Sequence, residues 1–158
     1  MLSSGPVLGG FLLASLAVAS SGILFKPGAW YRTLRKPSWT PPNRAFPIVW
    51  GVLYVMIAVS GWLAWHAGGF PIVPFGIFAM QLVLNFLWSM LFFGWRRPDL
   101  AFLDIVLLWL AVALNILLFW PLSTLAALLL VPYLVWVTVA ASLNLALWRL
   151  NRENGAFA

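Results

Sequence analysis

Long stretches of this sequence carry no charged side chain: residues 1–25, 45–95 and 105–148 contain no Asp, Glu, Lys or Arg. A helix that rises 1.5 Å per residue needs about 20 apolar residues to cross roughly 30 Å of hydrocarbon. Only 8% of the residues are charged, whereas soluble domains hold about 25%, so a water-facing surface cannot be built. Barrel strands would alternate polar and apolar residues over about ten positions. The sequence therefore predicts an all-α integral membrane protein.

Helix breakers divide these stretches into separate spans. HAGGFP interrupts the second stretch, RRPD separates it from the third, and PLS interrupts the third. No basic residue precedes the first run and no A-x-A-like cleavage site follows it, so we predict a retained span and not a signal peptide. We expect residues 1–158 to form a single five-helix bundle without a soluble domain. The predicted spans are approximately residues 6–25, 45–65, 72–95, 100–120 and 124–148.

The basic residues test this number of spans. With five spans, all nine Lys and Arg residues fall on one side of the membrane, and merging or splitting one span would scatter them. Cytoplasmic segments of membrane proteins carry the excess of Lys and Arg. We therefore predict that loop 26–44 and the C-terminus are cytoplasmic and that the N-terminus lies outside.

Tryptophan occupies two kinds of position. Residues near the predicted span ends fit an interfacial belt, in which the indole ring sits at the headgroup level. Others fall deeper within the spans and need another explanation. The belt group is Trp30, Trp65, Trp95, Trp120 and Trp148, and the interior group is Trp50, Trp88, Trp109 and Trp136.

Three spans carry aromatic and amide side chains at helical spacing, which places them on one face of each helix. Amides are costly when they face lipid, so these faces should turn toward the bundle. They could simply hydrogen-bond a neighbouring helix, or they could line a ligand cavity, and spacing alone leaves both open. The three stripes are Phe46, Trp50 and Tyr54; Gln81, Asn85, Trp88 and Phe92; and Trp136, Ala140 and Asn144.

Asp104 is the only acidic residue inside a predicted span. A carboxylate at membrane depth is a candidate proton or cation site. Its shallow position favours a structural role, in which it pairs with Arg96, Arg97 or a loop cation, or accepts hydrogen bonds from backbone amides.

Conventional catalytic chemistry has no visible site in this sequence. There is no cysteine and only one histidine, His66, which we expect in a solvated loop, so neither a metal site nor haem ligation is predicted. No glycine-rich phosphate loop, paired carboxylates or histidine-activated serine is apparent. We expect no resident cofactor and no nucleic-acid partner, and an enzymatic role is left open.

Four segments of the sequence form a recognisable pattern. They are WYRTLRKPSWTPPNRAFPIVWGVLY (30–54), QLVLNFLW (81–88), FFG (92–94) and VPYLVW (131–136), with LN following at 143–144. Together they resemble the translocator protein family, also called tryptophan-rich sensory proteins or peripheral-type benzodiazepine receptors. The resemblance covers essentially the whole chain and is closest to a bacterial member. It implies a five-helix bundle, often a homodimer, that binds porphyrins, sterol-like lipids and benzodiazepine-site drugs. The membrane would be bacterial, the inner one by the charge pattern, with the outer membrane as the alternative.

The resemblance also implies a pocket. The first loop of such proteins folds as a lid over the cavity mouth, and Trp50 and Trp136 match two tryptophans linked to light-dependent porphyrin breakdown. Leu145 stands where animal members carry a tyrosine in a proposed cholesterol motif, which is a weak motif even when complete. The matching pocket positions are Tyr31, Trp39, Pro41, Phe46, Trp50, Asn85, Trp88, Trp136, Ala140 and Leu143.

The proline-rich loop suits a lid on physical grounds. Proline fixes φ and removes a backbone donor, so KPSWTPP (36–42) can cross a cavity mouth with few unpaired amides. We expect Trp39 to supply an apolar surface there. The neighbouring cations could meet porphyrin propionates, or they could only set topology and contact anionic headgroups.

These observations predict a membrane receptor or sensor that binds porphyrins of the protoporphyrin IX type and other hydrophobic ligands, linked to tetrapyrrole regulation or transport. Its partners would be that ligand, membrane lipids and a second copy of the chain. One alternative is a transporter of porphyrins or lipid-like molecules, although carriers commonly show repeats, broken helices or several buried ionisable groups. The other is light-dependent porphyrin degradation, in which Trp50 and Trp136 would take part.

Overall fold

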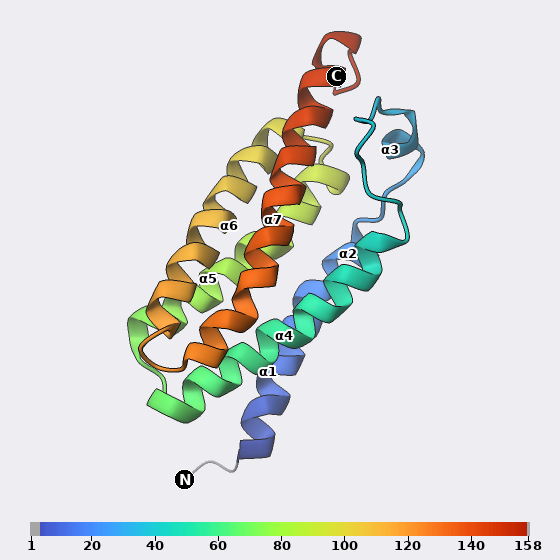
Figure 1. Cartoon of the computed structure of the whole chain (residues 1–158). Coiled ribbons are helices and arrows are strands. Elements are labelled where there is room, and N and C mark those ends of the chain that lie inside the picture. Colours follow the sequence, from blue (N-terminus) through green and yellow to red (C-terminus); the bar gives the residue numbers. More distant parts are fainter. Residues whose placement is uncertain (1–3, 158) are drawn as a thin grey trace.

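The computed structural model describes residues 4–157, which form helices and no strand (Figure 1). Five helical segments are long and apolar enough to cross a membrane: Ser4–Leu24, Ala45–Gly68, Ile72–Gly94, Pro98–Phe119 and Thr124–Asn154. The predicted fold class is therefore confirmed. The elements in chain order are α1 (Ser4–Ala19), α2 (Ser21–Leu24), α3 (Ala29–Thr33), α4 (Ala45–Gly68), α5 (Ile72–Ser89), the π-helix η1 (Met90–Gly94), α6 (Pro98–Phe119), α7 (Thr124–Asn151) and the 3₁₀ helix η2 (Arg152–Asn154).

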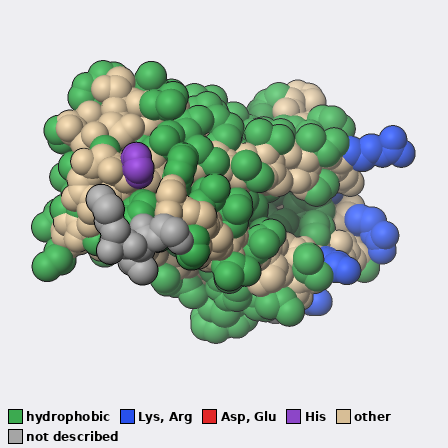
Figure 2. All heavy atoms as spheres, turned by 90° about the horizontal axis from the view of Figure 1, so that it is seen from below, with side chains coloured by type: hydrophobic (Ala, Val, Ile, Leu, Met, Phe, Trp, Pro, Cys, Tyr) green, Lys and Arg blue, Asp and Glu red, His purple; other side chains and the backbone are tan. Residues whose placement is uncertain are grey.

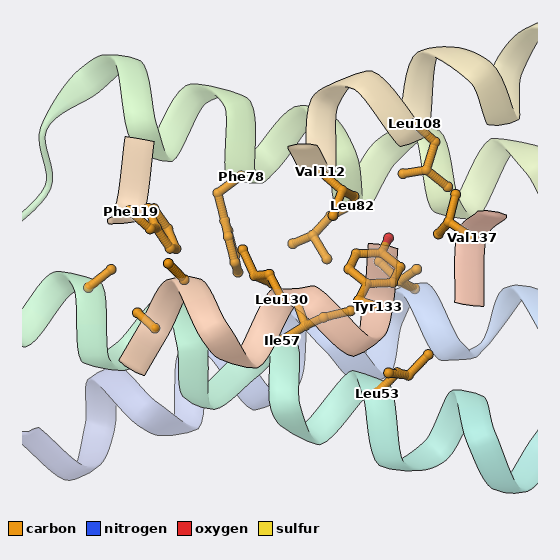
Figure 3. Close-up of a cluster of buried hydrophobic side chains, with 14 of the residues drawn as sticks. Leu53, Ile57, Phe78, Leu82, Leu108, Val112, Phe119, Leu130, Tyr133 and Val137 are labelled. Carbon is orange, nitrogen blue, oxygen red and sulfur yellow. The ribbon is translucent and has the colours of Figure 1, made fainter. Parts of the chain in front are cut away.

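The long helices form a ring whose order differs from the order in sequence. α1 packs against α4, α4 against α7, α7 against α6, α6 against α5, and α5 closes the ring on α1 (Figure 1). Apolar side chains point inward at the centre of this ring. Leu53, Phe78, Leu108, Leu130 and Tyr133 belong to one buried cluster that joins α4, α5, α6 and α7 (Figure 3). This cluster fills the part of the bundle farther from α3.

Local sequence explains where the helices begin and end. Pro98 starts α6, where its missing N–H costs nothing, and the Ser123 side chain accepts a hydrogen bond from the Ala126 amide (3.2 Å) to cap α7. Gly69 ends α4 at φ +69°, a conformation that glycine adopts without a Cβ penalty. At the end of α5 the Trp95 amide donates to the Met90 carbonyl (2.8 Å). That five-residue interval widens the last turn and forms η1.

The two ends of the bundle differ in charge. α3, the α5–α6 connection and the C-terminus lie at one end, and the α4–α5 and α6–α7 connections lie at the other (Figure 1). All nine Lys and Arg residues belong to segments at the α3 end. Figure 2 shows the blue Lys and Arg side chains gathered at one end of a face that is otherwise apolar or uncharged. The arrangement is that of a multi-pass membrane protein with one cationic end.

A cavity beneath the cationic loop

A cavity of about 590 Å³ lies between the helices at the cationic end of the bundle. Small-molecule sites in proteins are commonly 300–1,000 Å³. Its walls come from α2, α3, α4, α5, η1 and α7, and the buried cluster of Figure 3 fills the bundle beyond it. The space is therefore a pocket that ends in packed protein.

Aromatic rings make up much of the wall. On α4, Trp50 stacks on Tyr54 with ring centroids 5.5 Å apart and planes 24° from parallel. On the opposite wall Trp88 stacks on Phe92 at 5.3 Å and 24°, and Phe93 of η1 packs edge-on against Trp88 at 5.8 Å. The wide turn of η1 thus places two consecutive phenylalanines on the cavity wall. The site offers flat apolar surfaces on two sides.

A chain of hydrogen bonds joins the cavity floor to the core. The Tyr54 hydroxyl donates to Asn85 Oδ1 (3.0 Å), and Asn85 Nδ2 donates to the Tyr133 hydroxyl (2.6 Å). That hydroxyl in turn donates to Gln81 Oε1 (2.9 Å). The stripe on α5 therefore serves both roles left open by the sequence, because Gln81 bonds a neighbouring helix while Asn85 does so and also lines the cavity.

A second amide makes similar bonds nearer the cationic end. The Trp88 indole N–H donates to Asn144 Oδ1 (3.0 Å), and Asn144 Nδ2 donates to the Pro98 carbonyl (2.8 Å). These bonds fix the Trp88 ring between α5 and α7. Since protein partners already use these polar groups, the cavity wall that remains for a ligand is largely apolar.

The structure brings together seven of the ten residues suggested by the resemblance: Tyr31, Phe46, Trp50, Asn85, Trp88, Ala140 and Leu143 all line the cavity. The other three lie elsewhere. The Trp39 side chain is 51% exposed, and neither it nor Pro41 is among the lining residues. Trp136 packs edge-on against Phe46 (5.7 Å) and lines a separate apolar groove between α4 and α7. Trp136 therefore packs against a residue of the cavity wall, Phe46, and is not itself part of that wall.

Loop 26–44 is tied to the end of α7. The Arg35 amide donates to Asn151 Oδ1 (2.8 Å), Asn151 Nδ2 donates to the Arg35 carbonyl (2.9 Å), and the Trp30 indole donates to the Ala156 carbonyl (2.9 Å). Tyr31 is thereby buried against the cavity, and burial raises the pKa of its phenol, which stays neutral at physiological pH. Tyr31 and Arg32 of the short helix α3 line the cavity, and no residue of KPSWTPP (36–42) does so.

Four residues at the end of the first span line the cavity although the resemblance does not name them: Ser21, Gly22, Ile23 and Phe25. The small residues of ASLAVASSG (14–22) leave a role in a cavity wall open, because they are equally typical of close helix packing. Only the break between α1 and α2, which places these residues at the edge of the cavity, distinguishes the two. No motif in this stretch signals that break.

Asp104 lies outside the cavity lining, and among residues 4–157 it forms no ion pair with Arg96, Arg97 or a loop cation, the partners that its position suggested. Arg97 forms its ion pair with Asp99 on the surface (2.7 Å). Asp104 is 6% exposed, and its Oδ2 has no hydrogen-bond partner among residues 4–157. His66 stacks beside Trp62 (5.9 Å, 24°) near the opposite end of the bundle, and the described part of the chain brings no three metal-ligating side chains together.

Five membrane-spanning helices surround an aromatic pocket that a docked cationic loop also lines. This arrangement defines a multi-pass membrane protein with a cavity of small-molecule size. Residues 6–149 match the TspO/MBR family, and the chain belongs to that family.

Proteins from distantly related organisms are similar to this chain over most of their own length. Protein CrtK of Rhodobacter capsulatus is 40% identical over 147 residues, 89% of this chain and 90% of that protein. The tryptophan-rich sensory protein of Cereibacter sphaeroides is 40% identical over 142 residues, 89% of each chain. The human translocator protein is 39% identical over 149 residues, 90% of this chain and 88% of that protein. The names of the last two proteins describe sensing and translocation.

Proposed function

We propose that this protein is a membrane receptor that binds a flat, largely apolar ligand of the porphyrin type, such as protoporphyrin IX, and links its occupancy to tetrapyrrole regulation. One observation carries the proposal: the 590 Å³ cavity has aromatic walls on two sides and a cation at its mouth. A tetrapyrrole presents a planar ring and an anionic edge, so this wall chemistry matches it.

The aromatic walls supply affinity for the ring. Trp50 and Phe46 line one side, and Trp88 and Phe92 line the other. Stacked or edge-on aromatic contacts contribute about 0.5–1.5 kcal/mol each beyond the burial of area. Since Asn85 and Asn144 are already bonded within the protein, a planar apolar ligand leaves few wall groups without partners.

The cation at the mouth supplies a contact for propionates. Arg32 lines the cavity and is exposed, and a guanidinium matches the geometry of a carboxylate. Lys36 is occupied elsewhere, because its ammonium donates to the Tyr31 carbonyl (2.7 Å) and lies 4.5 Å from the centroid of the Tyr31 ring. Among the loop cations, Arg32 is therefore the one that we assign to the ligand.

Trp50 is the basis of the test. Protoporphyrin IX would be titrated into the reconstituted protein, with binding followed by quenching of protein fluorescence and by the porphyrin absorbance shift. Trp50→Ala should raise the Kd by about tenfold, which corresponds to about 1.4 kcal/mol. The matched control is Trp120→Ala, because Trp120 is 50% exposed at the end of α6 and lies outside the cavity lining. Equal loss in both variants, or no saturable binding by the wild type, would contradict the proposal.

A second candidate is light-dependent breakdown of the bound porphyrin by oxygen, and the position of Trp50 on the cavity wall favours it. Indole is oxidised more easily than phenyl, so Trp50→Phe should retain much of the binding and suppress the loss of porphyrin absorbance in light. Breakdown that is unchanged in Trp50→Phe would remove Trp50 from this role. Transport has less support, because packed side chains fill the bundle beyond the cavity.

A further inference from the structure

The first span does not follow one neighbour along its whole length. α1 packs on α4, where the Trp62 indole donates to Ser4 Oγ (2.9 Å). After the turn at Ser20, α2 leans on α5 instead, and Ser21 Oγ donates to Ser89 Oγ (3.1 Å). Phe25 continues this contact edge-on against Phe86 (6.1 Å). The break therefore draws the end of the first span away from α4.

Residues on both sides of the resulting gap line the cavity and are also exposed. They are Gly22 and Ile23 on α2 and Pro47 and Gly51 on α4. A residue that lines a cavity and is exposed at the surface marks a place where that cavity reaches the outside. A Cβ added at Gly22 or Gly51 would meet no atom within 4 Å, so both glycines border open space.

The depth of this opening places it in the membrane. Gly51 lies six residues into α4 from Ala45, which is about 9 Å along the axis at 1.5 Å per residue. α4 spans 24 residues, about 36 Å, against a hydrocarbon core of roughly 30 Å. The surrounding surface is apolar, since Ile23, Ile48 and Val52 are 68%, 66% and 56% exposed. This depth and this apolar surface indicate that the gap faces lipid and not water.

We propose that the gap between α2 and α4 is a lateral portal through which the ligand enters the cavity from the hydrocarbon of the leaflet on the cationic side. This inference rests on the proposed binding function and assigns its ligand to molecules dissolved in the membrane. The competing route runs from water beneath the loop, past Pro27 and Asn43. That route passes a loop held to α7 by the paired Arg35–Asn151 hydrogen bonds, whereas the lateral one needs no element to move.

The sequence provides a test that needs no ligand, because the chain contains no cysteine. Ala140→Cys places one thiol on the α7 wall of the cavity, where the native residue is 6% exposed. Its labelling in vesicles would be compared between pyrene maleimide dissolved in the bilayer and a sulfonated maleimide in the surrounding buffer. The portal predicts faster labelling by the reagent in the bilayer.

Closing the gap should then slow that labelling. Adding Gly22→Leu and Gly51→Leu should reduce the rate about tenfold, within the range over which association rates vary among variants of one site. Leucine is a better helix former than glycine, and neither added Cβ meets another atom, so the fold is retained. Gly76→Leu is the matched control, an exposed helical glycine on α5 outside the cavity. Labelling only from the buffer, or a rate that the leucine pair leaves unchanged, overturns the portal.

Binding kinetics separate this inference from the proposed function. With protoporphyrin IX delivered from vesicles, the leucine pair should slow association and dissociation together, so that the rates change more than the Kd. A wild type that does not bind protoporphyrin IX contradicts the proposed function while the labelling result still decides the portal. A wild type that binds, with rates unaffected by the leucine pair, contradicts the portal alone.

Discussion

Single residues in this protein connect the cavity to the core, and Tyr133 is the clearest case. Its hydroxyl accepts from Asn85 (2.6 Å) and donates to Gln81 (2.9 Å), and the residue is fully buried. Both amides therefore depend on one oxygen atom. A buried polar group that loses its partner costs about 1–3 kcal/mol, so the stability of the bundle and the shape of the cavity floor are coupled here.

Tyr133→Phe should lower the free energy of unfolding by about 1–3 kcal/mol, because Asn85 Nδ2 and Gln81 Oε1 lose a partner. Tyr31→Phe is the control, since the Tyr31 ring packs on Phe92 and Phe93 through its faces and edges. Thermal unfolding in detergent, followed by circular dichroism, measures both. Equal destabilisation by the two changes would mean that the hydroxyl of Tyr133 adds little to the packing of its ring.

For Asp104, unlike Tyr133, we expect that removing the polar group does not lower the free energy of unfolding. As a partner of Arg96 or Arg97 it would stabilise the bundle, but it is buried and its Oδ2 is unpaired. Burying a polar group without a partner is unfavourable, so Asp104→Leu should leave the free energy of unfolding unchanged or raise it by on the order of 1 kcal/mol. The same unfolding assay measures this. A marked loss of stability would show that the carboxyl group has a structural partner after all.

At the scale of elements, the sequence predicts the five spans and their inward faces because uncharged runs and helical spacing are strong local signals. The sequence does not predict the break between α1 and α2, and it does not predict the π-helix η1. Both features depend on which neighbouring helix each segment contacts. Trp39 illustrates the same limit. A tryptophan between prolines suggests a residue that covers a cavity. The hydrogen bonds of Trp30 and Asn151 instead dock the loop through α3, and Trp39 is left half exposed.

Asn151 is the main clamp between loop 26–44 and α7, with bonds to the amide and carbonyl of Arg35 and to the Leu147 carbonyl. Each bond contributes about 0.5–1.5 kcal/mol, so Asn151→Ala should release the loop and speed tryptic cleavage after Arg32 and Arg35 by about tenfold or more. Asn154→Ala, at an exposed position in η2, is the control. Unchanged cleavage in Asn151→Ala would mean that other contacts keep the loop in place, either the hydrogen bond of Trp30 or apolar packing.

At the scale of the whole molecule, the basic residues are confined to one end of the long axis of the helix bundle. The cationic end carries loop 26–44 and the C-terminus, and the far end carries uncharged connections (Figures 1 and 2). The cavity lies at the cationic end. Lys and Arg are retained on the cytoplasmic side during insertion. A ligand pocket that opens at the cationic end is therefore expected to face the cytoplasmic leaflet.

Labelling from the two sides of the membrane tests this orientation. Because the wild-type chain lacks cysteine, single thiols can be introduced by Ser38→Cys in the cationic loop and by Ala67→Cys near the end of α4. Both native residues are exposed, and Ala67 is preferred to Gly68, where a Cβ would lie 2.8 Å from the Leu122 side chain. An impermeant maleimide added to intact right-side-out vesicles should label Ala67→Cys at once and Ser38→Cys only after the vesicles are opened. The reverse order would show that the protein has the opposite orientation in the membrane. Labelling of both thiols from one side would contradict the five-span arrangement itself.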